Sequence, residues 1–283
     1  MSERPGSLMI IGGSEDRTEN KTILERFVKQ CGGTKSKILI LTAASTVPDQ
    51  VWRQYDDAFK ALGTPNHSHL HIQDRSEAGD AAIQKQVATA DGIFITGGDQ
   101  KRLLASTGGT PLHDALHDAL KRGACIAGTS AGASAMSAHM LASGKAELQA
   151  AKGAIALGAG YGLLTRFVID QHFSERHRLA RLLSVVADNP NLFGMGIDED
   201  TAFLIEQNRA IEVLGSGAVT ILDGRHVVSN VADIEEGECL EMADVRLHLL
   251  PSGSRYGTGD GAGKDKSPSA PLADILNLVT QIA

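Results

Sequence analysis

The stretch CIAGTSAGASAM, Cys125 to Met136, holds the turn that decides the fold. Its first apolar residues are typical of a buried strand, and the run breaks at Gly128 before an Ala-rich segment. A single serine, Ser130, stands between Gly128 and Gly132. Glycines let a chain turn sharply from a strand into a helix, so this pattern has the residue types of a nucleophile elbow. It also fits a serine that only caps the helix, or a phosphate-binding turn.

Upstream of this turn, short apolar runs alternate with helical segments. The expected strands are Ser7–Ile11, Lys37–Leu41 and Gly92–Thr96, and the expected helices are Asn20–Gln30, Gln50–Ala61 and Pro111–Arg122. This alternation predicts an α/β fold with a parallel, doubly wound sheet flanked by helices. Ligands of such sheets bind beyond the carboxyl ends of the strands. Three glycine-rich turns are therefore candidates for the site: the turn at Ser130, Gly12-Gly13-Ser14 and Gly97-Gly98-Asp99-Gln100.

After about residue 205 the pattern changes to short strand-like segments, at Ala210–Leu214, Ala218–Leu222 and Val227–Val231. Asp223-Gly224 predicts a hairpin turn between the last two of them. We expect a C-terminal antiparallel β extension within a single domain that spans residues 1–283. Enrichment in Gly, Ser and Pro predicts a flexible loop over about 251–271, and a last helix is expected at Leu272–Ile282.

The overall charge and the apolar runs bear on partners and location. With 27 Lys and Arg against 34 Asp and Glu, the net charge of −7 argues against nucleic acid or an anionic membrane as a partner. The first apolar run is too short for a signal peptide, and no later one approaches a membrane span. The three cysteines lack the spacing of zinc sites, and we expect them to be reduced. These features predict a cytoplasmic protein.

A serine nucleophile needs a base, so the histidines matter. His67, His69 and His71 alternate as in a strand and would share one face, where a metal site is conceivable. No carboxylate or cysteine completes that set nearby, so solvated strand-face histidines are the preferred interpretation. His172 instead follows the strand-like Phe167-Val168-Ile169 and lies in the segment 170–181, which is dense in functional groups. The alternative there is a solvated helix start.

Charged residues follow His172 in two groups. Three arginines come within six positions: Arg176, Arg178 and Arg181. Because the guanidinium fork matches a carboxylate, they indicate a pocket for a carboxylate-bearing substrate. Further on stand three successive acids, of which any one could orient His172 through its second nitrogen: Asp198, Glu199 and Asp200. The alternatives are that all three are loop-surface acids or a cation site.

Four motifs together resemble those of the cyanophycinase family: TGGDQ at 96–100, GTSAGA at 128–133, DQHFSERHRLAR at 170–181 and GIDEDTA at 196–202. Cyanophycinases are serine peptidases of the family that also contains peptidase E, and their fold is similar to that of class I glutamine amidotransferases. The resemblance runs from about Ser7 to the end of the chain. The combination is specific, whereas GxSxG alone is not.

The resemblance implies a serine exopeptidase that hydrolyses cyanophycin, a polyaspartate with arginine on each side-chain carboxyl, to β-aspartyl-arginine dipeptides. It implies that Ser130 is the nucleophile, that His172 is the general base and that Glu199 orients His172. It also implies an oxyanion hole made by the amides of Ala131 and of the Gly98-Asp99 turn. Residues expected to line the substrate pocket are Gln100, Asp170, Gln171, Arg176, Arg178 and Arg181.

The resemblance further implies a homodimer. The expected reaction, acyl transfer through the serine, needs no metal or organic cofactor. Within the pocket, we expect the arginines to hold the carboxylate of the terminal unit while Asp170 faces the substrate guanidinium. Two other functions stay open. One is a peptidase E-like α-aspartyl dipeptidase, and the other is a non-catalytic, amidotransferase-like module that binds a small acidic metabolite.

Overall fold

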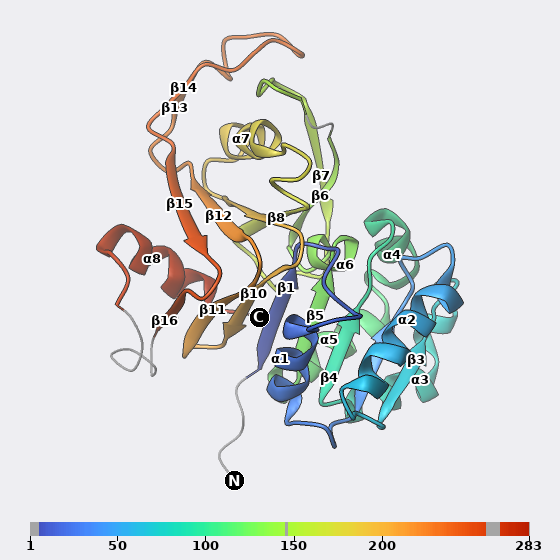
Figure 1. The fold of residues 1–283 in the computed structure, drawn as a ribbon. Coiled ribbons are helices and arrows are strands. Elements are labelled where there is room, and N and C mark those ends of the chain that lie inside the picture. Colours follow the sequence, from blue (N-terminus) through green and yellow to red (C-terminus); the bar gives the residue numbers. More distant parts are fainter. Residues whose placement is uncertain (1–5, 145–146, 259–266, 283) are drawn as a thin grey trace.

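An eight-stranded sheet occupies the centre of the molecule in the computed structural model, which describes residues 6–144, 147–258 and 267–282 (Figure 1). Its parallel part contains, in spatial order, β1 (Ser7–Ile11), β5 (Cys125–Thr129), β4 (Gly92–Ile95), β2 (Ile38–Leu41) and β3 (His67–Leu70). Beyond β1 the sheet continues antiparallel through β10 (Thr201–Glu206), β11 (Ala210–Gly215) and β16 (Arg255–Gly257). The predicted parallel α/β sheet with an antiparallel extension is confirmed.

Helices cover both faces of this sheet. Along β1, Met9 and Ile11 pack toward one face, which is covered by α1 (Thr22–Cys31) and α2 (Pro48–Ala61). Leu8 and Ile10 pack toward the other face. The elements there are η1 (Glu77–Gly79), α3 (Ala81–Thr89), α4 (Gln100–Thr107), α5 (Pro111–Lys121) and α6 (Ala131–Ser134). Because both faces are covered, the central strands are apolar at nearly every position.

A second sheet, which the sequence did not predict, packs beside the first. Its order is β15 (Arg246–Pro251), β12 (Ala218–Asp223), β9 (Phe193–Ile197) and β8 (Phe167–Gln171), with β8 and β9 parallel. One face shares a hydrophobic cluster with the central sheet, where Met195 joins Ile205 and Val213. The other face is covered by α7 (Leu179–Asp188), whose Leu182 and Val185 pack against Val168. This packing places the end of β8 close to the central sheet.

Smaller elements complete the fold and correct two predictions. The hairpin predicted at Asp223-Gly224 is wrong, because β12 pairs with β9 and β15. The segment after it forms β13 (Val228–Ser229), which pairs with β14 (Met242–Ala243). The loop predicted over 251–271 is wrong at both ends, since Pro251 ends β15, β16 follows, and α8 (Ala270–Val279) already begins at Ala270. Residues 259–266 lie outside the described residues. A separate hairpin joins β6 (His139–Gly144) to β7 (Ile155–Ala159).

The three alternating histidines, two in β3 and one directly after it, contact other protein groups. Thr42 Oγ1 lies 2.8 Å from His69 Nε2 and 3.2 Å from His71 Nδ1. His67 Nε2 lies 2.8 Å from a carboxylate oxygen of Asp56. The Trp52 ring stacks on His69 with ring centroids 5.0 Å apart. Across the described part of the chain, no group of three or more His, Cys, Asp or Glu side chains is arranged to hold a metal ion.

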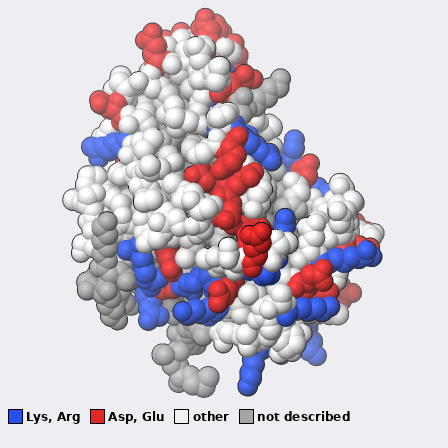
Figure 2. Space-filling view, in the orientation of Figure 1, with Lys and Arg blue, Asp and Glu red and all other residues white. Residues whose placement is uncertain are grey.

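The surface charge, the cysteines and the lengths of the helices can be compared with what the composition predicted. On the face in Figure 2, acidic side chains gather near the centre and basic ones occur in several separate places among them. Cys31 and Cys125 are buried, Cys239 is exposed, and all three are free thiols. No helix in the ranges that the structure describes is long and apolar enough to cross a membrane.

Candidate active site

The turn after β5 holds Ser130 in a conformation that L residues rarely adopt. Its φ is 52° and its ψ is −111°, and its amide donates to Ile11 O at 3.0 Å, which fixes the residue to the end of β1. The flanking glycines leave no room for side chains. A Cβ on Gly128 would lie 2.5 Å from Gly132 O, and one on Gly132 would lie 2.3 Å from Ile95 O. The turn therefore presents the serine hydroxyl at the carboxyl end of the central strands.

His172 approaches Ser130 from the second sheet. It follows β8, its φ is 48°, and its amide donates to Gly12 O at 2.8 Å. The imidazole packs directly on Gly13, where a Cβ would lie 2.3 Å from His172 Cε1. Ser130 Oγ lies 2.9 Å from His172 Nε2. The two predicted residues therefore lie within hydrogen-bonding distance, and the Gly12-Gly13-Ser14 turn supplies the space for the ring.

Of the three successive acids, Glu199 is the one that reaches the imidazole. Its Oε1 lies 2.5 Å from His172 Nδ1. Asp198 accepts from the Ser174 hydroxyl at 2.6 Å and from the Ala218 amide at 3.0 Å. Asp200 turns the other way and accepts from the Asp16 amide at 3.0 Å. Asp198 and Asp200 thus hold backbone in place, and the structure separates three residues that the sequence left equivalent.

The electrostatics of this group favour a neutral imidazole. Burial lowers the pKa of His172 from its ordinary value, and although hydrogen bonding to Glu199 opposes this, the positive charge of Arg176 adds to it. Burial works to raise the pKa of Glu199, but the hydrogen bond and charge of His172 outweigh it, so the pKa is lowered. An ionised carboxylate only accepts, so Nδ1 carries the proton. Nε2 is then left to accept the proton of the Ser130 hydroxyl.

The predicted oxyanion donors differ in their availability. The Asp99 amide donates to Ala44 O at 2.9 Å, and the Asp99 side chain caps α4 by accepting from the Lys101 amide at 2.7 Å. The expectation that the Asp99 amide faces an oxyanion is therefore wrong in this geometry. The amides of Ala131 and Gly98 have no acceptor among the described residues. Gly98 has a φ of +143° and a Cβ there would lie 2.2 Å from Ala44 O, so only glycine fits.

Asp170 does not face the pocket, contrary to expectation. Its side chain is 1% exposed, and Arg181 donates to it through Nε at 2.9 Å and through Nη2. Arg178 Nη1 donates to Asp170 at 3.2 Å and to Gln171 Oε1 at 2.9 Å. A carboxylate already bound by two guanidinium groups is not free to bind a third from a substrate. Because α7 packs over β8, these residues form an internal ion cluster instead.

The remaining predicted pocket residues are more accessible. Gln100 begins α4, is half-buried, and donates through Nε2 to Leu141 O at 3.1 Å. Arg176 is exposed, and its charge is felt by His172 and Glu199. Neither is among the residues that line the space in front of Ser130, and Gln171 belongs to the buried cluster, where its Oε1 accepts from Arg178.

A cavity of about 460 Å³ opens in front of Ser130 and His172. The turns after β1, β2, β4 and β5 line it, as expected for the carboxyl edge of a parallel sheet. Sequence reasoning missed several of its residues, among them the polar Glu15, Arg17 and Tyr55. The available signal was the run of charged residues Glu15-Asp16-Arg17 directly after the Gly12-Gly13-Ser14 turn, which was itself predicted to lie at the site.

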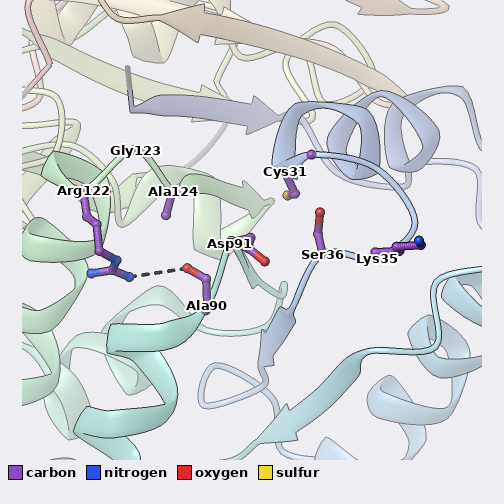
Figure 3. Close-up of a pocket in the computed structure, with 9 residues that line it drawn as sticks. Cys31, Lys35, Ser36, Ala90, Asp91, Arg122, Gly123 and Ala124 are labelled. Carbon is purple, nitrogen blue, oxygen red and sulfur yellow. Dashed lines mark hydrogen bonds between the residues drawn. The ribbon is translucent and has the colours of Figure 1, made fainter. Parts of the chain in front are cut away.

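A second cavity, of about 510 Å³, lies at the opposite edge of the sheet (Figure 3). Its residues precede β2, β4 and β5, and they include Ser36, Asp91 and Ala124. Arg122 lies at one side of it and donates to Val87 O at 3.1 Å and to Ala90 O at 3.4 Å. This cavity contains none of the predicted site residues.

Comparison with known sequences agrees with this site. The profile of Peptidase family S51 matches residues 8–213, which is well over half of the chain. The chain belongs to peptidase family S51. This S51 peptidase is 37% identical over 272 residues to a cyanophycinase from Geminocystis herdmanii, covering 95% of this chain and 97% of that protein. It is also 37% identical over 257 residues to a cyanophycinase from Thermosynechococcus vestitus, covering 90% and 80% of the two chains.

Among solved structures, the S51 peptidase is similar to the crystal structure of a peptidase from an acI-B1 Actinobacterium. The TM-score is 0.68 at 20% sequence identity, covering 91% of this chain and 98% of that one. This likeness concerns the fold. The comparisons confirm the predicted resemblance to the cyanophycinases and the assignment as a serine peptidase enzyme.

Proposed function

We propose that this S51 peptidase hydrolyses cyanophycin as a serine exopeptidase and releases β-aspartyl-arginine dipeptides. One observation carries the proposal: Ser130 Oγ, His172 Nε2 and Nδ1, and Glu199 Oε1 lie in one hydrogen-bonded line with separations of 2.9 and 2.5 Å. That order of hydroxyl, imidazole and carboxylate is what activates a serine for acyl transfer. The proposed substrate is taken from the names of the relatives. They are cyanophycinases, and their similarity covers most of this chain.

In the proposed reaction, Ser130 Oγ attacks the backbone carbonyl carbon while His172 Nε2 accepts the hydroxyl proton. Glu199 holds the imidazole in the tautomer that can accept and stabilises the imidazolium that forms. The tetrahedral intermediate collapses when the C–N bond breaks and the leaving amine takes the proton from His172. Water, deprotonated by the same imidazole, then attacks the acyl-enzyme and frees Ser130.

The negative oxygen of the intermediate needs hydrogen-bond donors. We assign this role to the amide of Ala131, the residue after the serine, and to that of Gly98, which lines the same cavity as Ser130. Neither amide has an acceptor among the described residues. Backbone amides fixed before the reaction cost no reorganisation when charge develops, and one such donor contributes a rate factor of roughly 10²–10³. The strained φ of Ser130 is what aims its hydroxyl at the cavity and keeps the Ala131 amide beside it.

Replacement of Ser130 by Ala tests this function. Hydrolysis of insoluble cyanophycin granules, followed by loss of turbidity and by chromatography of the dipeptide, should fall by a factor on the order of 10⁶. Binding of a short cyanophycin fragment to the Ala variant should persist, because the hydroxyl is small and lies at the end of the cavity. Residual turnover within about tenfold of the wild type would exclude Ser130 as the nucleophile.

Two further measurements separate the alternatives. A peptidase E-like enzyme would hydrolyse an α-aspartyl dipeptide and leave the granules intact. A binding module would not react with a serine-directed covalent reagent, whereas a nucleophile should be labelled at Ser130 at a rate that depends on deprotonated His172.

We also propose that residues 1–283 form one domain, because a hydrophobic cluster runs continuously from the central sheet into the second one. A homodimer in the cytoplasm is proposed with it. The three free thiols support a reducing compartment. Size-exclusion chromatography with light scattering tests the dimer, and cell fractionation tests the location.

A further inference from the structure

The catalytic cavity has a buried acid that the reaction does not use. Glu15 is 2% exposed, and both of its oxygens already accept hydrogen bonds. Oε1 accepts from the Tyr55 hydroxyl, and Oε2 accepts from Thr129 Oγ1 at 2.5 Å. Thr129 directly precedes Ser130, so this acid ties the elbow to α2. With both oxygens accepting hydrogen bonds from the protein, Glu15 is not free to bind substrate.

Arg17 lies beside Glu15 but does not donate a hydrogen bond to it. Its Nη1 is 4.0 Å from Glu15 Oε1, which is beyond hydrogen-bonding distance, and 3.4 Å from the Tyr55 hydroxyl. The guanidinium lies over the Tyr55 ring, 5.3 Å from its centroid. Among the described residues, nothing accepts a hydrogen bond from Nε or Nη2 of Arg17. The side chain is therefore held in place while most of its donors stay available.

Arg17 is also the source of positive charge in this cavity. Its side chain is 32% exposed, and it is the one Lys or Arg among the described residues that line the space in front of Ser130. The acids of the lining are engaged, Glu15 by two hydroxyls and Asp99 by the amides at the start of α4. An available guanidinium fork in a cavity whose own acids are occupied is suited to an incoming carboxylate.

We infer that Arg17 binds a carboxylate of the substrate and sets the preference of the peptidase for acidic chain units. This inference rests on the proposed function. A cyanophycin unit offers two such groups, the α-carboxylate of its arginine branch and, at one end of the polymer, the terminal carboxylate of the aspartate backbone. The sequence analysis assigned carboxylate binding to Arg178 and Arg181, but both are buried in the ion cluster with Asp170. Arg17 has this role instead.

The test uses synthetic two-unit cyanophycin fragments in three forms: unmodified, with the arginine branches as carboxamides, and with the chain-terminal carboxylate as a carboxamide. The kcat/KM of each form is measured for the wild type, Arg17→Met, Arg17→Lys and Arg53→Met. Arg53 is exposed on α2, does not line the cavity, and controls for the loss of one positive charge. Thermal unfolding of each variant shows whether the fold is kept.

For the wild type, one of the two carboxamides should be the poorer substrate by about 10- to 100-fold, the range of a charged hydrogen bond. In Arg17→Met that ratio should fall to near 1, mainly through KM. Arg17→Lys should keep part of it because the charge remains without the fork, and Arg53→Met should keep all of it. The carboxamide that shows the effect identifies the source of the carboxylate.

Two results would overturn the inference. If the wild type cleaves the fragments but Arg17→Met prefers the carboxylate forms as strongly as the wild type does, Arg17 does not bind the carboxylate, and the proposed function stands. If the wild type cleaves none of the fragments and no granules, the proposed function fails and the inference fails with it.

Discussion

Replacement of Gly13 by Ala should displace the imidazole of His172 while every catalytic residue keeps its chemical identity. A Cβ at this position would lie 2.3 Å from Cε1 and 2.5 Å from Nε2 of His172. That is about 1 Å short of van der Waals contact, so the ring has to move by a comparable distance. A misplacement of this size costs roughly 10²-fold in rate, or about 2.7 kcal/mol of transition-state stabilisation.

The same substitution also strains the backbone, because Gly13 has a φ of +105°. A non-glycine residue there costs about 1–3 kcal/mol of folding free energy. Gly33 provides a matched control, because its φ is +98° and a Cβ added there would have no atom within 4 Å. Gly33→Ala should therefore lose similar stability and keep its kcat.

The assay combines kcat on soluble cyanophycin fragments, urea unfolding, and the rate of covalent labelling of Ser130. We expect Gly13→Ala to lose about 100-fold in kcat and in labelling rate, and Gly33→Ala to lose neither. If Gly13→Ala retained the kcat of the wild type, or if both variants lost activity in proportion to stability, the close fit between Gly13 and the His172 ring would not matter for catalysis.

Three other substitutions test the electrostatics. Activity should fall as pH drops through the pKa of His172, which burial holds below its ordinary value. Arg176→Gln should move this acid limb of kcat/KM to higher pH, because a nearby positive charge is removed. An unmoved limb, or an equal shift in Arg53→Gln, would contradict this. Glu199→Gln should lower kcat by about 10²–10⁴-fold, because the amide no longer fixes the imidazole tautomer. Thermal stability should change little, because the Glu199 side chain is partly exposed. An unchanged kcat would exclude the orienting role. Asp170→Asn should lower the free energy of unfolding, measured in urea, by about 3–5 kcal/mol, because two buried arginines lose their carboxylate. Normal stability together with a loss of activity confined to arginine-bearing substrates would restore the expectation that this acid faces the substrate.

The sequence was sufficient where short-range patterns decide the structure. Apolar runs such as Ile38–Leu41 are covered on both faces, and only a central strand of an α/β sheet needs that composition. The Ser130 turn could be predicted because its strand, glycines and helix are neighbours in the chain. The rule that sites gather at carboxyl ends of strands then placed Gly13 and Gly98 near the serine, as observed.

The rest depends on packing that no local pattern specifies. Asp198, Glu199 and Asp200 became distinct only because the chain crosses there from β9 to β10, so that successive side chains point to different neighbours. Asp170 was predicted to face the substrate because the sequence shows how close it stands to the arginines. The sequence does not show that α7 buries it. Arg17 was missed because its availability depends on how Tyr55 and Thr129 occupy Glu15.

The hydrogen-bonded residues Ser130, His172 and Glu199 come from two different sheets, and this affects when they can meet during synthesis of the chain. Ser130 follows β5 of the central sheet, whereas His172 follows β8 and Glu199 follows β9 of the other. A nascent chain emerging from a ribosome has its hydroxyl long before its carboxylate, and β10, which borders β1, comes later still. Under the proposed mechanism, such a polypeptide gains hydrolytic activity only after the second sheet has packed against the first. The proposed site is therefore completed only after most of the chain has been synthesised.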